Sequence, residues 1–277
     1  MPRASKLSWF VLICCASIAA GCSARQRIDL ETSAAKVLVS DEDEQKLGEQ
    51  VKQELEQKQQ IRYLNDAVVT SYVQGVADRI LNLAKRDRPN QKWQLFVIDD
   101  LKTVNAFATP GGYIYVYSGL LTSADNEAEI AGVLAHESGH VVARHVARQL
   151  VETYGLQAVL SLALGENPSL LEKLAGTIAA NGALLAHSRS DENEADEYGA
   201  RYSSAAGYDP HGLVTFFQKL QAQSGNQPKV LTWLSTHPAT PDRIEHVNRF
   251  IADNHLTGSD IGAERLRPIK QRLAGHR

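Results

Sequence analysis

The sequence predicts an α+β domain that is mainly helical and carries a small β-sheet. Apolar residues recur at helical spacing before residue 90 and again after residue 123, which is the pattern of amphipathic helices. Between these regions, residues 93–98 and 112–117 are rich in aromatic and β-branched side chains, which favour strands. The chain has 277 residues, 43% of them hydrophobic, so it is long enough to bury a sizeable core.

The charge composition excludes several classes of protein. Charged residues make up 22% of the chain, and the formal net charge is −3. This balance is typical of a folded protein and not of a disordered, collagen-like or coiled-coil chain. It provides no strongly basic surface, so we expect no nucleic-acid partner.

Residues 1–21 have the features of a cleaved signal peptide. Two basic residues precede an uncharged stretch at residues 7–20, which is shorter than the roughly 20 residues of a membrane-spanning helix. The small residues before Cys22 resemble a bacterial lipobox, whose cysteine becomes the acylated N-terminus. Residues 22–39 are polar and aperiodic, as a tether is, and the folded domain is expected at residues 40–277.

The alternative for Cys22 is an incidental cysteine beside an ordinary signal peptide, which would leave the mature protein free in the periplasm. We expect instead a lipid-anchored protein of the cell envelope. The residue after Cys22 is not Asp, and this resembles lipoproteins sorted to the outer membrane, where the domain would face the periplasm. All three cysteines lie within the first 22 residues, so the folded domain has no thiol to pair in an oxidising compartment.

Two helices are expected before the sheet. Ser40 is followed by four acidic residues, which is typical of a helix N-terminus because the helix dipole favours negative charge there. The helical pattern then runs to about residue 60. A second amphipathic helix is expected at residues 66–86, where apolar side chains recur three and four residues apart.

Three short strands follow these helices. They are expected at residues 93–98, 104–108 and 112–117, where aromatic and β-branched residues gather. The segment Thr109-Pro110-Gly111-Gly112 is a turn signal, so the last two strands should form a hairpin.

The remainder of the chain is expected to be helical. Two apolar stretches in it are too short or too charged to span a bilayer. Asp209-Pro210 is typical of a helix start, because proline suits the first helical position. The expected helices are 125–154, a stretch at 169–206 that is open to a break, 210–223 and 241–254.

The strongest chemical signal is the segment His136-Glu137-Ser138-Gly139-His140. On a helix, two histidines four residues apart share a face and can reach one zinc ion. Glu137 lies one residue along, where its carboxylate can hold a water molecule on the metal. The alternative is a pair of solvated helix histidines beside an acid.

A catalytic zinc ion needs a third protein ligand, and an acidic segment downstream provides candidates. Glu192 and Asp196 are four residues apart and face the same way on a helix. One can bind a metal while the other accepts the second N–H of a ligand histidine. Glu194 should point elsewhere, and the alternative for the whole segment is a solvated charged face.

Four segments together resemble a known family. They are residues 105–112, 134–140, 188–196 and 237–243, which lie in the same order and at suitable separations. They resemble the zinc metallopeptidases of the CAAX prenyl protease and HtpX family, and within it the exported lipoproteins typified by LoiP, with BepA a relative. The resemblance implies a zincin-like metalloprotease domain, in which the edge strand of a small sheet flanks the active-site helix.

The resemblance also implies the roles of the motif residues. His136, His140 and Glu192 would bind one Zn²⁺ per chain. Glu137 would be the general base, and Asp196 would support a ligand histidine.

His237 and Arg243 match family residues near the metal. They could stabilise the oxyanion of the tetrahedral intermediate, or His237 could take the fourth zinc position until substrate displaces it. His237 could also be an ordinary turn residue before Pro238. The sequence leaves these alternatives open.

The resemblance assigns substrate binding to the edge strand. A peptide would lie extended along Asn105, Ala106 and Phe107 and be held by main-chain hydrogen bonds. These residues could equally be ordinary members of the strand.

The other histidines have no spacing that favours a metal. His145 follows His140 by five residues, which is about 500° around a continuous helix and hence about 140° away from the face of His140. We expect His145 to be solvated or structural, and we expect no metal role for His187.

These observations predict a zinc endopeptidase of the bacterial cell envelope, anchored to the membrane through its N-terminal lipid. The resemblance implies that its substrates are polypeptides, namely misfolded or stalled periplasmic or outer-membrane proteins. The alternative is a non-proteolytic chaperone or assembly factor for outer-membrane proteins, with a zinc site blocked by His237.

Overall fold

The computed structural model describes residues 39–59, 61–181, 187–223, 231–238 and 240–275. The expected signal peptide and nearly all of the expected tether, including Cys22, lie outside the described residues. Within the described part of the chain, no helix has both the length and the apolar character needed to cross a membrane.

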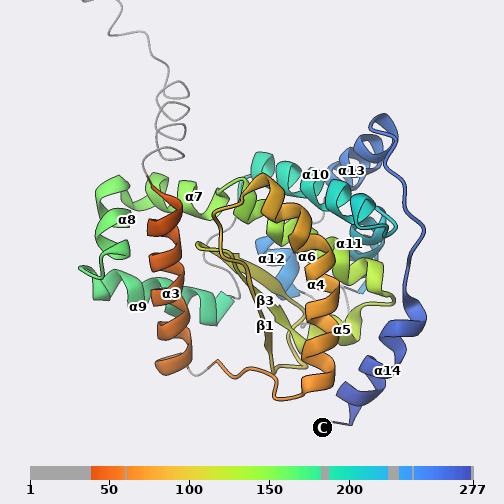
Figure 1. Ribbon diagram of the computed structural model, residues 1–277, viewed down its shortest axis with the longest axis horizontal. Coiled ribbons are helices and arrows are strands. Elements are labelled where there is room, and N and C mark those ends of the chain that lie inside the picture. The colour runs from red at the N-terminus through yellow and green to blue at the C-terminus, as the bar shows by residue number, and fades with distance from the viewer. Residues whose placement is uncertain (1–38, 60, 182–186, 224–230, 239, 276–277) are drawn as a thin grey trace, which may run out of the picture.

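The described residues form a mainly helical structure around one small mixed sheet, which confirms the predicted α+β class (Figure 1). In chain order the elements are α3 (Asp41–Gln57), α4 (Ala67–Asp87), β1 (Gln94–Ile98), β2 (Ala106–Thr109), β3 (Tyr113–Tyr117), α5 (Ser118–Ser123), α6 (Glu127–Val142), α7 (His145–Tyr154), α8 (Leu156–Ala163), α9 (Pro168–Asn181), α10 (Arg189–Ala205), α11 (Gly212–Gln223), α12 (Leu231–Thr236), α13 (Pro241–Asp253) and α14 (Ala263–Ala274).

The sheet has the strand order β1-β3-β2. β1 runs parallel to β3, and β2 pairs antiparallel with β3 in the predicted hairpin. The turn of that hairpin needs glycine, because Gly111 and Gly112 have φ values of 86° and 79° and a Cβ on Gly112 would lie 2.2 Å from the Lys92 carbonyl oxygen. The strand order makes β2 an edge strand. It begins two residues later than predicted.

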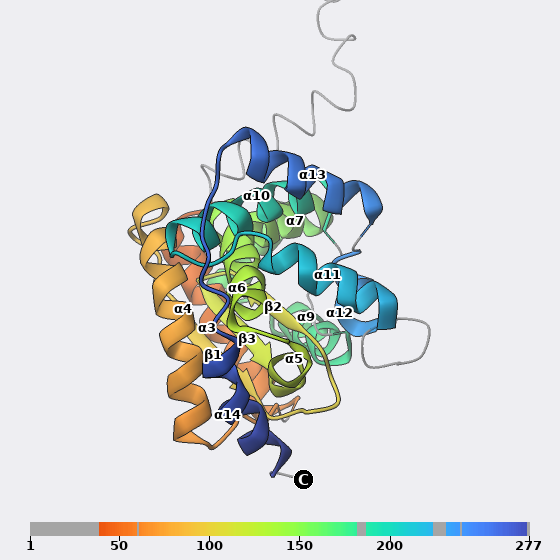
Figure 2. The ribbon, with the colours of Figure 1, turned by 90° about the vertical axis from the view of Figure 1, so that its right-hand side faces the viewer.

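Helix α6 is the centre of the molecule. It packs against α4, α10, α11 and β2, and Figure 2 shows it running between α4 on one side and α11 on the other. A Cβ on Gly132 would lie 2.7 Å from the Leu213 backbone nitrogen, so a glycine is required where α6 and α11 meet. This packing buries nearly every residue of α6, including its polar ones.

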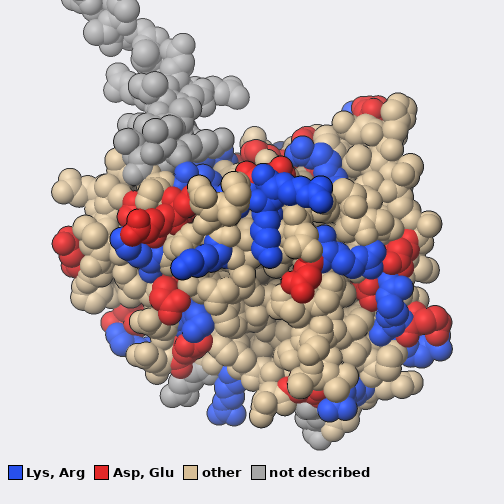
Figure 3. All heavy atoms as spheres, in the orientation of Figure 1, with Lys and Arg blue, Asp and Glu red and all other residues tan. Residues whose placement is uncertain are grey.

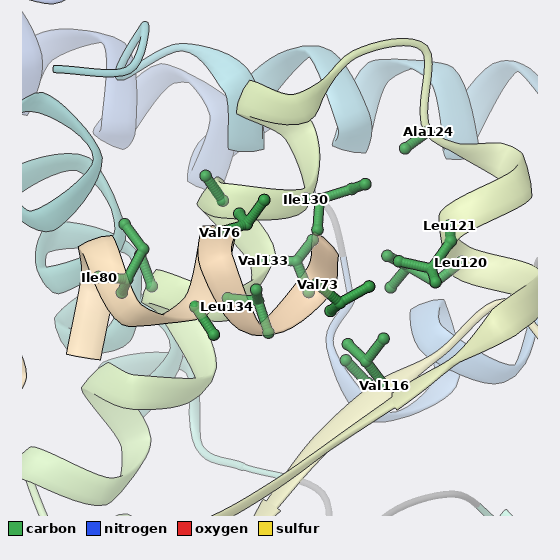
Figure 4. Close-up of a cluster of buried hydrophobic side chains, with 14 of the residues drawn as sticks. Val73, Val76, Ile80, Val116, Leu120, Leu121, Ala124, Ile130, Val133 and Leu134 are labelled. Carbon is green, nitrogen blue, oxygen red and sulfur yellow. The ribbon is translucent and has the colours of Figure 1, made fainter. Parts of the chain in front are cut away.

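The core beside α6 is formed by aliphatic side chains from several elements (Figure 4). Each such side chain stabilises the fold by roughly 1.5–3 kcal/mol when fully buried. Helix α4 contributes Val73, Val76 and Ile80, α6 contributes Ile130, Val133 and Leu134, β3 contributes Val116, and α5 contributes Leu120 and Leu121. A second cluster lies where α7, α8 and α9 pack beside α3.

Local capping explains where the first two helices begin. Ser40 forms a capping box with Asp43, in which each side chain accepts a hydrogen bond from the backbone N–H of the other residue. The Asp66 side chain accepts from the backbone N–H groups of Val68 and Val69. Both helix starts agree with the prediction.

The prediction of one helix over residues 125–154 is wrong. Helix α6 ends at Val142, Arg144 takes a left-handed conformation with φ 61°, and α7 begins at His145. The Arg144 side chain donates to Glu44 Oε1 over 2.6 Å and also donates to the Val39 carbonyl oxygen. These contacts with the N-terminal segment hold the chain in a turn that the local sequence does not encode.

Two further boundaries differ from the prediction. α11 begins at Gly212 and not at Pro210, because Asp209 accepts hydrogen bonds from the backbone N–H groups of His211 and Gly212 in a turn that precedes the helix. The possible break in the predicted helical stretch 169–206 does occur, between α9 and α10. Residues 182–186 of this break lie outside the described part of the chain.

Acidic and basic side chains are interspersed over the face seen in Figure 3, with broad uncharged areas between them. This mixture agrees with the small formal net charge of −3.

Candidate active site

Four buried side chains from separate elements converge on one point. His136 and His140 come from α6, Glu192 from α10, and His237 from the residue that follows α12. Each offers one ligand atom, and these four atoms lie within 4.8 Å of one another. The structure thus brings the three predicted zinc ligands together and places His237 beside them. We call these four residues the donor cluster.

The distances between the donor atoms suit a tetrahedral metal ion. With metal bonds of 2.0–2.2 Å, the ligand atoms of such an ion lie about 3.3 Å apart. His136 Nε2 is 3.0 Å from His140 Nε2 and 3.8 Å from Glu192 Oε2. His140 Nε2 is 3.4 Å from Glu192 Oε1, and His237 Nδ1 is 3.3 Å from His136 Nε2 and 3.0 Å from Glu192 Oε1. The donor set is therefore compatible with a metal ion.

A buried ion-pair network lies behind Glu192. Asp196 is one helical turn further along α10, and its Oδ1 is 2.9 Å from His136 Nδ1. Arg243 donates to both Asp196 oxygens over 2.7 and 2.8 Å, and its Nη1 is 2.6 Å from Glu192 Oε2. Arg243 also donates to the Pro238 carbonyl oxygen over 3.0 Å. The guanidinium group thus joins Glu192 and Asp196 to the segment that carries His237.

Neighbouring charges lower the pKa values of the two carboxylates in this network, Glu192 and Asp196, against the effect of burial. Burial alone would raise the pKa of Glu192, but the neighbouring His237, His140 and Arg243 hold that pKa well below its ordinary value. Burial likewise opposes ionisation of Asp196, and Arg243 and His136 outweigh it, so that pKa is lowered. Glu192 and Asp196 are thereby kept in the charged form that a metal site requires.

Glu137 lies beside the cluster with an unsatisfied oxygen. Its side chain is buried, and Oε1 has no hydrogen-bond partner among the residues that the structure describes. Oε1 is 3.6 Å from His237 Nε2, and the carboxylate lies near the backbone of Ala108 in β2. Burial raises the pKa of Glu137, against the opposing effects of His237 and His136. A buried carboxylate oxygen without a partner is suited to a water molecule or a reacting group.

His237 is held from behind by an aromatic residue. Trp233, which is buried in α12, stacks on the His237 ring with centroids 5.1 Å apart and an interplanar angle of 27°. Trp233 is itself part of the hydrophobic core beside α6.

The residues predicted to bind substrate are in and beside the edge strand. Asn105 is buried directly before β2, and its Oδ1 accepts from the Ala106 backbone N–H over 2.9 Å. Phe107 is buried too, and its ring stacks on Tyr115 of β3 at 4.6 Å. The Phe107 side chain therefore belongs to the core that supports β2.

A cavity of about 300 Å³ adjoins the cluster. Glu192 and Arg243 line it together with His187, Asn193 and Pro238. A larger cavity of about 420 Å³ lies elsewhere, between the ends of α3, β1 and α9, and no member of the donor cluster lines it.

Two histidines near the cluster were not assigned to it from the sequence. His145 is buried with its Nδ1 only 2.9 Å from His140 Nδ1, and the His187 ring stacks on His140 at 3.9 Å. The expectation that His145 lies off the metal face assumed a continuous helix, and the turn at Arg144 removes that assumption. No glycine or proline marks this turn, so the sequence carried no signal for it.

Comparisons with known proteins agree with this geometry. The family model described as Peptidase family M48 matches residues 67–251, two thirds of the chain. The mitochondrial metalloendopeptidase OMA1 of Schizosaccharomyces pombe is 36% identical over 184 residues, which are 66% of this chain and 53% of the relative.

Two bacterial proteins named beta-barrel assembly-enhancing protease are also similar. The one from Yersinia pestis is 31% identical over 225 residues, 78% of this chain and 45% of the relative. The one from Escherichia coli K12 is 30% identical over 192 residues, 65% of this chain and 38% of the relative. The chain thus spans about half the length of these relatives or less.

Proposed function

This chain belongs to peptidase family M48, and from that membership and its donor cluster we propose that it is a zinc-dependent endopeptidase of the bacterial cell envelope. One observation carries the proposal. His136, His140 and Glu192 converge on one point, and the partnerless carboxylate oxygen of Glu137 lies beside it.

The donor set supports zinc as the metal. Two histidine nitrogens and one carboxylate oxygen form a known type of catalytic zinc site, in which a fourth position serves water or substrate. His136, His140 and Glu192 would hold the ion, with Asp196 fixing His136 from behind. When bound, zinc would polarise the peptide carbonyl and lower the pKa of a water molecule.

Glu137 is the group that moves the proton. As general base it takes a proton from the attacking water, and as general acid it passes this proton to the leaving amide nitrogen. Its burial next to the metal ligands and against β2 keeps bulk water from competing for the carboxylate.

The edge strand β2 is the proposed substrate site. A peptide that adds as a strand along Asn105, Ala106 and Phe107 would be held mainly by main-chain hydrogen bonds. This would place its carbonyl groups beside Glu137, since that carboxylate lies near the backbone of Ala108 in β2. Such binding depends little on sequence and suits unfolded segments, so misfolded or stalled periplasmic and outer-membrane proteins are the proposed substrates.

Arg243 and His237 take different parts in this proposal. The hydrogen bonds of Arg243 to Asp196 and its contact with Glu192 support a role in orienting these carboxylates. His237 Nδ1 lies at ligand distance from the other donors, which supports its service as a fourth ligand that substrate must displace. With the ring swung away, the same histidine would be free to stabilise the oxyanion.

The position of His237 also supports the second candidate function. If His237 closes the metal site permanently, the edge strand β2 would hold outer-membrane polypeptides without cutting them, as a chaperone or assembly factor would. Restoration of outer-membrane protein assembly by a Glu137→Gln variant in a strain that lacks the protein would favour this candidate.

Attachment to the envelope is proposed to occur through a lipid on Cys22. The basis is the lipobox-like sequence before Cys22. Labelled palmitate should be incorporated into the wild-type chain and not into a Cys22→Ser variant, and equal incorporation would contradict the anchor.

The peptidase proposal is tested by incubating unfolded β-casein with the full chain, its Glu137→Gln variant and a matched Glu197→Gln control. Glu197 lies on α10 and pairs with His246 away from the cluster, over 3.1 Å. Zinc content is measured on all three proteins by atomic emission. We expect about one zinc ion per chain in each and cleavage by the wild type and the control only, because Glu137 moves the proton and does not bind the metal.

Cleavage by the Glu137→Gln variant would contradict the mechanism. If no protein cleaves although all hold zinc, a His237→Ala variant separates the two candidate functions. Cleavage by this variant would show a peptidase held closed by His237, and its continued inactivity would contradict the peptidase proposal.

A further inference from the structure

A further histidine, His145, lies behind the donor cluster. His145, the first residue of α7, is fully buried, and its Nδ1 is 2.9 Å from Nδ1 of His140. Its other ring nitrogen, Nε2, is 3.2 Å from Glu194 Oε2 on α10. Side chains from α6, α7 and α10 thus form one chain of contacts, the His140–His145–Glu194 chain, which runs outward from the cluster.

The ring nitrogens fix the direction of every hydrogen bond in this chain. His140 directs Nε2 at the cluster, 3.0 Å from His136 Nε2. A nitrogen that binds a metal carries no proton, so a neutral His140 carries its proton on Nδ1. That N–H donates to Nδ1 of His145, which must then carry its own proton on Nε2 and donate it to Glu194. Each contact is satisfied with both rings neutral.

Glu194 is the better acceptor of the two nearby acids. Asp191 Oδ1 is also near His145 Nε2, but it is 3.6 Å away and accepts a hydrogen bond from Arg148. The Glu194 side chain is 41% exposed, so water solvates its charge. The His140–His145–Glu194 chain therefore links a buried ligand to a carboxylate without burying that charge in the core.

The backbone turn at Arg144 creates this arrangement. A left-handed conformation is unfavourable in a residue other than glycine, and Arg144 adopts it with φ 61° and ψ 31°. The Arg144 side chain compensates by donating to Glu44 and to the Val39 carbonyl oxygen. The turn directs α7 so that His145 returns to the back of His140, where a continuous helix would carry it away.

We propose that His145 is a positioning residue for the metal centre, which fixes the tautomer and ring orientation of His140 through the His140–His145–Glu194 chain. This inference rests on the proposed metallopeptidase function. His136 receives the equivalent support directly from Asp196 over 2.9 Å. The two ligand histidines are thus held by different means, and the His187 ring packed on His140 at 3.9 Å restricts rotation further.

The test compares two near-isosteric substitutions in the full chain, purified in mild detergent. His145→Asn keeps a carbonyl oxygen that can accept from His140, whereas His145→Leu has a similar size and no acceptor. The apparent Kd for Zn²⁺ is measured by competition with a chelator, and the visible absorption spectrum is recorded with Co²⁺ as the probe of ligand geometry. His246→Leu is the matched control, because His246 also pairs with a glutamate of α10 but lies outside the cluster.

We expect His145→Leu to raise the Kd for Zn²⁺ by roughly 10-fold or more, the range for lost partners of metal ligands, and to change the Co²⁺ spectrum. His145→Asn should restore most of the affinity and the wild-type spectrum, and His246→Leu should match the wild type. A wild-type Kd and spectrum for His145→Leu would overturn the inference. If His145→Leu does not fold, Glu194→Ala at the exposed end carries the test, and unchanged Zn²⁺ affinity and Co²⁺ spectrum there would overturn it.

A His140→Ala variant separates this inference from the proposed function. Loss of Zn²⁺ binding in His140→Ala with normal binding in His145→Leu would refute the positioning role and leave the metal site intact. Normal Zn²⁺ binding in His140→Ala would refute the metal site itself, and with it the role of His145.

Discussion

At the scale of single residues, Asp196 serves two partners with one buried carboxylate. It lies 2.9 Å from His136 Nδ1 and accepts two hydrogen bonds from Arg243. An Asp196→Asn substitution keeps the shape and removes the charge. We expect Zn²⁺ affinity to fall roughly 10- to 100-fold because His136 loses its partner, and the free energy of unfolding to fall by about 1–3 kcal/mol because Arg243 stays buried and underpaired.

The measurements for this prediction are chelator competition for zinc and urea unfolding of the metal-free protein. Glu197→Gln, also on α10 but paired with the more exposed His246, is the control and should change neither quantity. Wild-type zinc affinity in Asp196→Asn would show that Asp196 does not support the metal ligand.

Helical geometry predicted which candidate donors share a face of one helix, whereas the choice of Glu192 as ligand and the place of His237 near it followed only from the family resemblance. His136 and His140 share one face of α6, and Glu192 and Asp196 share one face of α10. The place of His145 was not predictable in this way. It depends on a contact between Arg144 and Glu44, which lie 100 residues apart in the chain.

At the scale of elements, the starts of α3, α4, α6 and α13, which each begin at a side-chain cap, were found from the sequence, whereas α14 was not. Its N-cap is Gly262 in a left-handed conformation with no side-chain cap, and Pro268 lies inside the helix. Tertiary contacts hold it instead. Leu266 and Leu273 are buried in the core, and Arg265 donates to Glu127 at the start of α6 over 2.8 and 3.0 Å.

The contacts of Arg265 predict a dependence of stability on pH. Burial would raise the pKa of Glu127, but hydrogen bonds from Arg265 and Tyr208 outweigh it and lower that pKa. The Arg265 hydrogen bond also lowers the pKa of Asp260. A carboxyl with a lowered folded pKa stabilises the fold above its unfolded pKa, and this contribution is lost as the pH falls through the folded pKa.

An Arg265→Met variant should therefore differ most from the wild type at neutral pH. The difference in free energy of unfolding should shrink once the pH falls below the ordinary values of 4.5 and 3.8 for Glu127 and Asp260. Urea unfolding at pH 7, 5, 4 and 3 measures it. Arg267→Met is the control, because Arg267 pairs with Glu264 on the exposed side of α14. An equally large difference at pH 3 and pH 7 would contradict the assigned contact.

At the scale of the whole molecule, the order of helices and strands was predictable, whereas their arrangement around α6 was not. The hairpin of β2 and β3 followed from its local turn, but the parallel pairing of β1 with β3 depends on the packing of the sheet. The donor cluster forms where α6, α10 and the segment after α12 meet. A bound metal ion would therefore tie together parts of the chain up to 101 residues apart.

We propose that one metal ion joins α6 and α10 through His136, His140 and Glu192, with Glu137 beside it. Crystals of the full chain grown with one equivalent of Zn²⁺ test this directly by anomalous diffraction at the zinc absorption edge. We expect one peak per chain, about 2.0–2.2 Å from His136 Nε2, His140 Nε2 and one Glu192 oxygen, with no bond to Glu137. A peak elsewhere, or one bonded to Glu137, would contradict it.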